Sequence, residues 1–282
     1  MILNQVKPGW LPGFFFALTL LFTPLCSYAG DNPAALILII DDIGNNRKLG
    51  QRTVNLPGPL NLAFLPHTPF ARTLANSAYE AGHTVMLHTP MANKADAKLG
   101  PGGMTTDMDK QQWQQTLIDN LAAIPHVQGV NNHMGSLLTE QRDAMSAVME
   151  ALLQQGMFFV DSLTTPKSVA SLQAKTTGLP HLQRDVFLDH VVTPEAIERQ
   201  FNKAIKLAKN RGLAVVIGHP YTETLDFLEK KLGNLSQDGI ALHSAQQYLY
   251  DRLWNDITTP ASRYQLLPFD LPALQSANSE HH

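Results

Sequence analysis

Aspartate, asparagine and histidine side chains recur at the ends of short apolar runs in this 282-residue sequence. In chain order they are Asp41-Asp42, His67, His88, Asn131-Asn132-His133, Asp161, Asp185, His219 and His243; Asp185 precedes its run and the others follow theirs. Carboxylates and imidazoles bind metal ions and carry protons, so acid–base and metal-assisted chemistry both use them. One such residue would mean little, but this many in the same register predict a shared site.

The most specific element is the pair Asp41-Asp42, which follows the entirely apolar residues 36–40. Two neighbouring carboxylates that are buried without a cation repel each other. A bound metal ion would neutralise one of them and leave the other free to act as a base. The alternative is that both acids cap a helix that begins near residues 43–45.

The apolar runs that carry these residues predict β-strands. They cover residues 36–40, 60–65, 84–87, 127–130, 157–160, 186–188, 214–217 and 240–242. Several are continuously apolar rather than alternating, which is typical of parallel strands buried on both faces.

Helical patterns separate the predicted strands. Thr68-Pro69 and Thr193-Pro194 each combine an N-cap residue with proline at the first helical position. Alternating strands and helices predict parallel strands joined by crossover helices. Seven or eight such units favour an α/β fold with a single (β/α) barrel-like domain, in which the carboxyl ends of the strands meet at one face. An open doubly wound sheet is the alternative.

Six short blocks contain most of the chemically active residues. They are residues 39–44 (IIDDIG), 88–91 (HTPM), 131–136 (NNHMGS), 159–162 (FVDS), 184–189 (RDVFLD) and 217–220 (IGHP). Together, over roughly residues 36–249, they resemble the divergent polysaccharide deacetylase family. This family is an offshoot of the carbohydrate esterases that hydrolyse N-acetyl groups from chitin-like and peptidoglycan sugars.

The resemblance implies roles for four residues. Asp41 would be the general base and His219 the general acid, while Asp42 and His88 would bind a divalent metal. The wider family places its second ligand histidine four residues after the first, but that position here is Ala92, which cannot bind metal.

His133, after the next predicted strand, is the expected replacement for the missing ligand. One carboxylate, two imidazoles and an open position suit zinc, which is the expected cofactor. Asn132, Asp161 and Asp185 are expected in supporting or substrate-binding roles.

The resemblance implies metal-dependent hydrolysis of N-acetyl groups on an amino-sugar polymer that is peptidoglycan-like or chitin-like. Ala92 and the absence of the arginine-proline block of the wider family leave a second reading open. In that reading the protein is a catalytically inactive polysaccharide-binding or scaffold protein that keeps the fold. Hydrolysis of another amide or ester is a third reading.

The amino-terminal residues have the pattern of a cleavable secretory signal. Lys7 supplies a positive charge, residues 14–22 form an uncharged apolar stretch, and Pro24 interrupts it. Ser27-Tyr28-Ala29 then places small residues three and one positions before the expected cut. The alternative is an uncleaved membrane anchor, which needs about 20 continuous apolar residues.

We therefore expect a signal peptide over residues 1–29 and a polysaccharide deacetylase-like domain over residues 30–282, with its core at about 36–249. Cys26, the only cysteine, leaves with the signal, so the mature chain forms no disulfide. Signal and resemblance together predict a periplasmic protein whose partner is a polysaccharide. The net charge of −3 without a basic run predicts no nucleic-acid partner. The lack of a second apolar stretch predicts no membrane contact after signal cleavage.

The export signal predicts a mature amino terminus within a residue or two of Gly30. Amino-terminal sequencing of the protein from a periplasmic extract of its native host measures this directly. Soluble cytoplasmic protein that still begins with Met1 would overturn the prediction.

Overall fold

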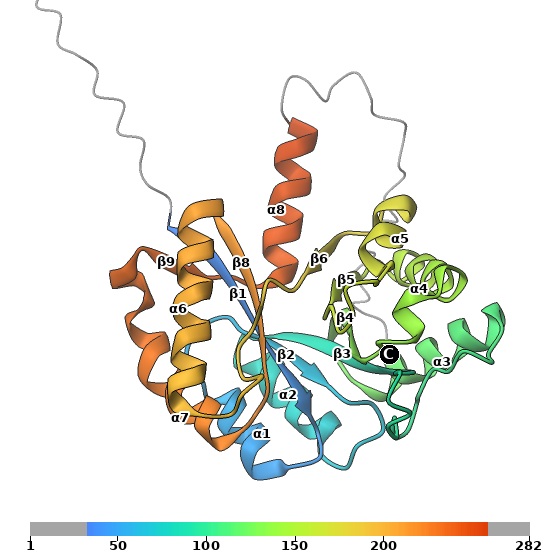
Figure 1. Cartoon of the computed structure of the whole chain (residues 1–282), viewed down its shortest axis with the longest axis horizontal. Helices are drawn as coiled ribbons and strands as arrows, with labels where there is room; N and C mark the ends of the chain where they lie inside the picture. The colour runs from blue at the N-terminus through green and yellow to red at the C-terminus, as the bar shows by residue number, and fades with distance from the viewer. Residues whose placement is uncertain (1–32, 259–282) are drawn as a thin grey trace, which may run out of the picture. The chain divides into compact units, whose positions relative to one another are not determined.

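The apolar runs form parallel strands in the computed structural model, which describes residues 33–258 (Figure 1). The strands are β1 (Ala34–Ile43), β2 (Asn61–Phe64), β3 (Thr84–Met91), β4 (Val127–Met134), β5 (Phe158–Asp161), β6 (His181–Gln183), β7 (Val186–Phe187), β8 (Leu213–Gly218) and β9 (Ile240–Leu242). Their order across the sheet is β6-β5-β4-β3-β2-β1-β8-β7, and β9 pairs with β1. Every strand pairing in the described residues is parallel.

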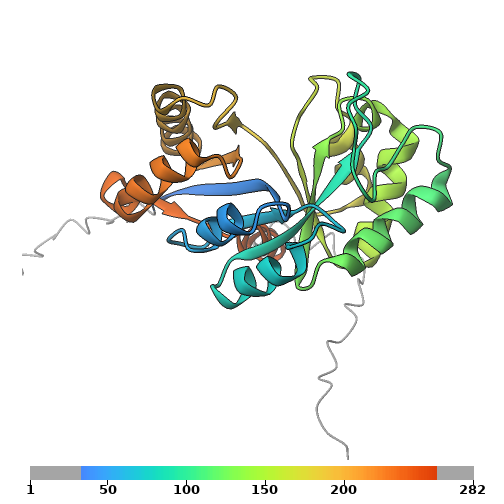
Figure 2. The same ribbon diagram turned by 90° about the horizontal axis from the view of Figure 1, so that it is seen from below.

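Helices connect most successive strands, and all but the last helix, α8, cover the outer side of the sheet (Figure 2). They are α1 (Arg47–Val54), α2 (Ala71–Glu80), α3 (Lys110–Ala123), α4 (Arg142–Gln154), α5 (Ala170–Thr177), α6 (Pro194–Arg211), α7 (Thr222–Lys231) and α8 (Ala245–Thr258), with the 3₁₀ helices η1 (Leu138–Glu140) and η2 (Leu232–Asp238). Local sequence fixes where several of them begin. The side chain of Thr193 accepts a hydrogen bond from the backbone of Ala196, and Asp109 forms a capping box with Gln112.

The sheet curves into a half-barrel, which confirms the predicted barrel-like fold. Strands that follow one another in sequence are mostly neighbours, whereas a doubly wound sheet would reverse its order at a switch point. All eight predicted strands are present. The ninth, β6, has three residues of which two are polar, so no apolar run marked it.

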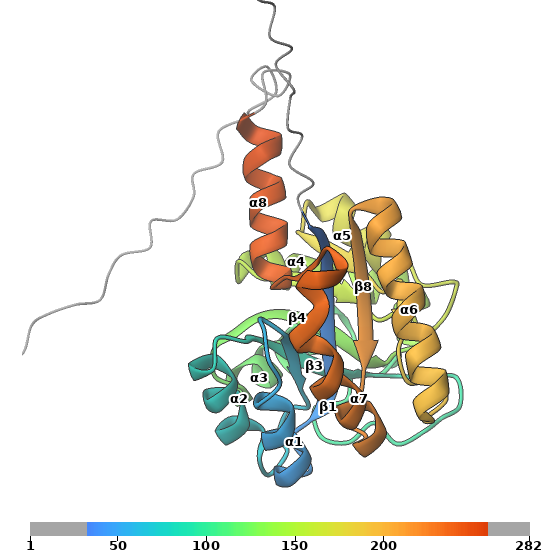
Figure 3. The same ribbon diagram turned by 90° about the vertical axis from the view of Figure 1, so that its left-hand side faces the viewer.

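Two apolar layers lie on the two faces of the sheet. In β1, Leu36, Leu38 and Ile40 belong to the cluster shared with the outer helices. Ile37 and Ile39 belong to an inner cluster that also contains Ala245 and Leu249 of α8. Figures 1 and 3 show α8 at the amino-terminal ends of β1 and β8. Strand alternation therefore carries Asp41, which follows Ile37 and Ile39, to the carboxyl end of the inner face.

The predicted signal segment, residues 1–29, lies outside the described residues. Between residues 33 and 258, no helix combines the length and the apolar character that a membrane crossing requires.

Gly129 of β4 gives room to a large side chain of the inner layer. A Cβ atom at this position would lie 2.3 Å from the ring of Phe158, which is buried on the neighbouring strand. We expect Gly129→Ala to lower the free energy of unfolding by about 1–3 kcal/mol, because a packed core resists an added methyl group. The measurement is the urea midpoint.

Gly233→Ala is the matched control, since a Cβ there would meet nothing within 4 Å. Equal stability of the Gly129→Ala protein and the wild type would contradict the close packing of Phe158 against β4.

Candidate functional site

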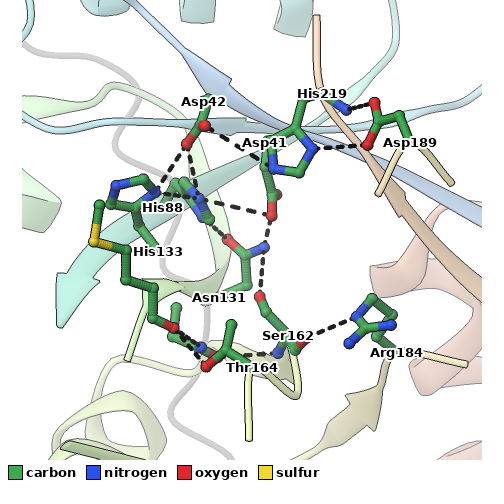
Figure 4. Close-up of polar contacts among 12 residues, drawn as sticks. Asp41, Asp42, His88, Asn131, His133, Ser162, Thr164, Arg184, Asp189 and His219 are labelled. Atoms are coloured by element: carbon green, nitrogen blue, oxygen red, sulfur yellow. Dashed lines mark hydrogen bonds and ion pairs between the residues drawn. The ribbon is translucent and has the colours of Figure 1, made fainter. Parts of the chain in front are cut away.

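The end of β1 departs from regular strand geometry at Asp42. Its φ angle is 58°, and the pairing of β1 with β2 shifts register between Ile40 and Ile43. Aspartate tolerates this left-handed conformation better than most residues. A regular strand would turn Asp41 and Asp42 to opposite faces, but this turn lets both carboxylates face His88 (Figure 4). The Nε2 atom of His88 lies 3.2 Å from Asp42 Oδ1 and 3.7 Å from Asp41 Oδ2.

Asp42, His88 and His133 bring three potential metal ligands together at the ends of β1, β3 and β4. Asp42 Oδ1 lies 2.9 Å from His133 Nδ1, and His133 Nδ1 lies 3.2 Å from His88 Nε2. Because β3 and β4 are neighbours, with Pro90 opposite His133, the two imidazoles meet across one strand pair.

The contacts among these three atoms fit a divalent cation. Asp42 Oδ1 is buried and makes no hydrogen bond, although two ring nitrogens surround it. Buried polar atoms rarely lack a partner, and such an atom calls for an explanation. A cation bound by Asp42, His88 and His133 would give all three atoms one partner, and the set matches zinc chemistry.

The pKa values of the two aspartates are shifted in opposite directions. Burial raises the pKa of Asp42, but the imidazoles of His133 and His88 outweigh burial and hold that pKa well below its ordinary value. Burial raises the pKa of Asp41 above its ordinary value, although His88, His219 and a hydrogen bond from Asn131 oppose the shift. Asp42 is therefore an ionised ligand candidate, while Asp41 is the better proton acceptor.

His219 follows β8 and lies on the other side of Asp42, with its Nε2 atom 3.9 Å from Asp42 Oδ2. Asp189 orients it: Asp189 Oδ1 lies 2.9 Å from His219 Nδ1, and Oδ2 accepts from the His219 backbone and from Thr224. Burial acts to lower the pKa of His219, but the hydrogen bond with Asp189 and the nearby carboxylates raise it to about 9. The ring therefore carries a proton near neutral pH.

Asn131, which the sequence placed among the strand-end residues without a role, contacts both Asp41 and His88. The predicted supporting residue Asn132 faces the opposite side of β4. Its side chain accepts from the backbone of Ser162 and donates to the carbonyl of Met134, so it fastens two loops. The alternation of β4 already indicates this difference, because Asn131 and His133 share one face.

Asp161 and Asp185 lie outside the cluster. Asp161 accepts hydrogen bonds from Leu163 and Ser168 and shapes the loop after β5. Asp185 accepts from the backbone of Val215 and pairs with Arg211. Asp189, rather than either of these, is the carboxylate that holds a histidine of the site.

His67 and His243, which the sequence listed among the strand-end residues, also lie outside the cluster. His67 is exposed, and its Nε2 atom lies 3.0 Å from Asn120 Oδ1. His243 follows β9, which pairs with the first residues of β1 rather than with its carboxyl end.

A cleft of about 360 Å³ opens beside Asp42 and His133. Its other lining residues are Asn45, Leu65, Pro66, Thr68, Pro90, Lys98, Leu99, Gly100 and Pro101. On the side of His219, the ring of Tyr221 lies 5.7 Å away and is 44% exposed. The cluster is thus accessible to a ligand and has apolar and polar groups around it.

Comparison with known proteins decides the family. A sequence model of the divergent polysaccharide deacetylases matches residues 38–249. The chain belongs to the divergent polysaccharide deacetylase family. The resemblance of the six sequence blocks is therefore confirmed.

Two relatives in this family are similar over most of their length. The uncharacterised protein YibQ of Escherichia coli is 33% identical over 225 residues, which cover 80% of this chain and 70% of YibQ. An uncharacterised protein of Haemophilus influenzae is 33% identical over 239 residues, which cover 84% of this chain and 83% of that protein.

Solved structures support the deacetylase-like fold. An uncharacterised protein of Agrobacterium tumefaciens matches with a TM-score of 0.74 at 21% identity, over 78% of this chain and 91% of that one. A variant of a Bacillus anthracis CE4 family pseudoenzyme, described as having restored enzymatic activity, matches with a TM-score of 0.52 at 14% identity, over 78% of this chain and 68% of that one.

The geometry predicts which histidines matter for metal binding. We expect His88→Ala and His133→Ala each to lower zinc affinity by about 10-fold or more, since loss of even an outer contact of a metal site costs about 10–100-fold. Competition with a chromophoric chelator measures the affinities.

His67→Ala is the control and should leave zinc affinity close to that of the wild type, because Asn120 holds His67 outside the cluster. If His67→Ala lost zinc while His133→Ala bound it fully, the prediction would be wrong. The third ligand would then be His67, after β2, and not His133 of β4.

Proposed function

We propose that this protein is a zinc-dependent hydrolase that removes N-acetyl groups from an amino-sugar polymer in the periplasm. The observation that carries the proposal is the arrangement around Asp42. Three potential metal ligands, a buried carboxylate with a raised pKa and a histidine with a raised pKa lie around Asp42, which borders an accessible cleft. Membership of the deacetylase family supports the same reaction class.

Asp42, His88 and His133 would hold the metal. When bound, a divalent metal supplies two effects: it makes water more acidic, and it stabilises negative charge on a carbonyl oxygen. Three protein ligands would leave a further position for water, as in catalytic zinc sites.

Asp41 acts as the general base. It takes a proton from the attacking water, and burial favours this uptake because the neutral carboxyl group is the less costly form. The hydrogen bond from Asn131 holds Asp41 Oδ1, and Oδ2 points toward His88.

His219 acts as the general acid. Asp189 holds the Nδ1 side, so Nε2 faces the site and donates its proton to the amine nitrogen that leaves. Water and the N-acetyl group are consumed, and acetate and a free amine are formed.

An amino-sugar polymer suits the cleft beside Asp42. Its volume of about 360 Å³ lies within the range of small-molecule sites, which is enough for part of a sugar chain. Asn45, Thr68 and Lys98 offer polar groups to sugar hydroxyls and substituents. The periplasmic location rests on the signal pattern of residues 1–29.

The second candidate is an inactive polysaccharide-binding or scaffold protein. Ala92 at the usual position of the second ligand favours it, and one protein of similar fold is a variant of a CE4 family pseudoenzyme. Against it stands the presence of both Asp41 and His219 at the site.

Acetate release separates the two candidates. We expect the zinc-loaded protein to release acetate from peptidoglycan or chitin oligomers, and Asp41→Asn to lower the rate by about 10²–10⁴-fold, the range for loss of a general base. An enzyme-coupled acetate assay measures this, with zinc content determined in the same samples.

Asp41→Asn keeps Asp42, His88 and His133, so its zinc content should match the wild type. Tight binding of one polymer by zinc-loaded wild type without any acetate release would favour the scaffold candidate.

A further inference from the structure

The side-chain amide of Asn131 contacts both the proposed base, Asp41, and the proposed metal ligand, His88. Its side chain is completely buried at the end of β4. The Nδ2 atom donates to Asp41 Oδ1 at 2.7 Å and lies 3.3 Å from Ser162 Oγ. The Oδ1 atom lies 2.8 Å from His88 Nδ1.

The chemistry of these partners fixes the orientation of the amide. An ionised Asp41 can only accept hydrogen bonds, so the NH₂ group of Asn131 must face it. The carbonyl oxygen of Asn131 then faces His88 and can only accept. The Nδ1 atom of His88 must therefore carry the ring proton.

The same orientation prepares His88 for a metal. A neutral imidazole with its proton on Nδ1 has a free electron pair on Nε2, the atom that lies 3.2 Å from both Asp42 Oδ1 and His133 Nδ1. The reversed amide would place NH₂ against Nδ1 and leave the proton on Nε2, where it would block the metal.

We propose that Asn131 is a positioning residue that sets the tautomer of the ligand His88 and the orientation of the base Asp41 at the same time. This inference rests on the proposed metal site and adds to it a residue that couples metal binding to proton transfer. Hydrogen bonds to the far nitrogen of a ligand histidine generally fix its tautomer in metal sites. Here the acceptor is Oδ1 of Asn131, and Nδ2 of the same amide donates to the base, Asp41.

Two substitutions separate the two effects of Asn131. Asn131→Leu has a similar shape and removes both contacts, so His88 loses its acceptor and Asp41 its donor. Asn131→Asp keeps an acceptor for His88 Nδ1 but places a second carboxyl group against Asp41, so the two carboxyl groups share a proton and Asp41 is no longer a free base. Asn132→Leu is the matched control, because Asn132 is a buried neighbour of the same type whose hydrogen bonds go to loops.

The experiment combines zinc competition with ¹⁵N NMR of the histidine rings in the metal-free proteins. Burial acts to lower the pKa of His88, but Asp41 and Asp42 raise it, so the spectra are recorded at a pH high enough to give a neutral ring. In the wild type we expect that ring to carry its proton on Nδ1. Asn131→Leu should give a mixture of tautomers and zinc affinity lower by about 10–100-fold, as for other outer contacts of metal sites. Asn131→Asp should keep the tautomer and the zinc affinity while losing acetate release.

The inference is overturned if Asn131→Leu keeps both the tautomer and the affinity, or if Asn132→Leu loses as much zinc affinity as Asn131→Leu. A wild type that shows the expected tautomer but binds no zinc would instead refute the metal site of the proposed function. Urea midpoints of all variants identify losses that come from unfolding.

Discussion

Asp41 and Asp42 bring two carboxylates to the end of one buried strand, and the surroundings have to stabilise both. Burial alone would drive protons onto them. Imidazoles from β3, β4 and the end of β8, together with the amide of Asn131, stabilise the ionised carboxylates. The left-handed backbone at Asp42, a conformation that costs about 1–3 kcal/mol, is what turns both carboxylates toward these partners. Strain of this kind is retained where the neighbouring residues hold the backbone in place.

The half-barrel supplies the partners because its strands are parallel and nearly sequential. β1 is central, with β2 and β3 on one side and β8 on the other, so the carboxyl ends of all these strands reach one rim. The inner apolar layer below the rim, filled by residues such as Phe158 and Leu249, keeps the lower part of the sheet dry. Polar groups are therefore concentrated at one end, where Asp41, His88 and Asn131 are buried and interact strongly.

Much of this arrangement could be predicted from the sequence, and the misses have local causes. Continuous apolar runs predicted the eight longer or more apolar strands. β6 was missed because its three residues are too few and too polar to form an apolar run. The family resemblance assigned Asp42 and His88 as ligands, and the place of His133 after the next strand added the third, but their metal-binding role stays a prediction. The turn of the backbone at Asp42 could not be predicted, because no sequence pattern identifies a left-handed aspartate. Asp189 was overlooked in favour of Asp161 and Asp185, since which carboxylate reaches His219 depends on tertiary packing.

The central claim is that the end of β1 forms a zinc site with a base beside it. Anomalous diffraction at the zinc absorption edge, from crystals of the zinc-saturated protein, tests it most directly. The account predicts one strong peak bonded to Asp42 Oδ1, His88 Nε2 and His133 Nδ1 at about 2.0–2.2 Å, with Asp41 close by but not bonded. A peak held by other residues, or none at this position in a saturated crystal, would contradict it.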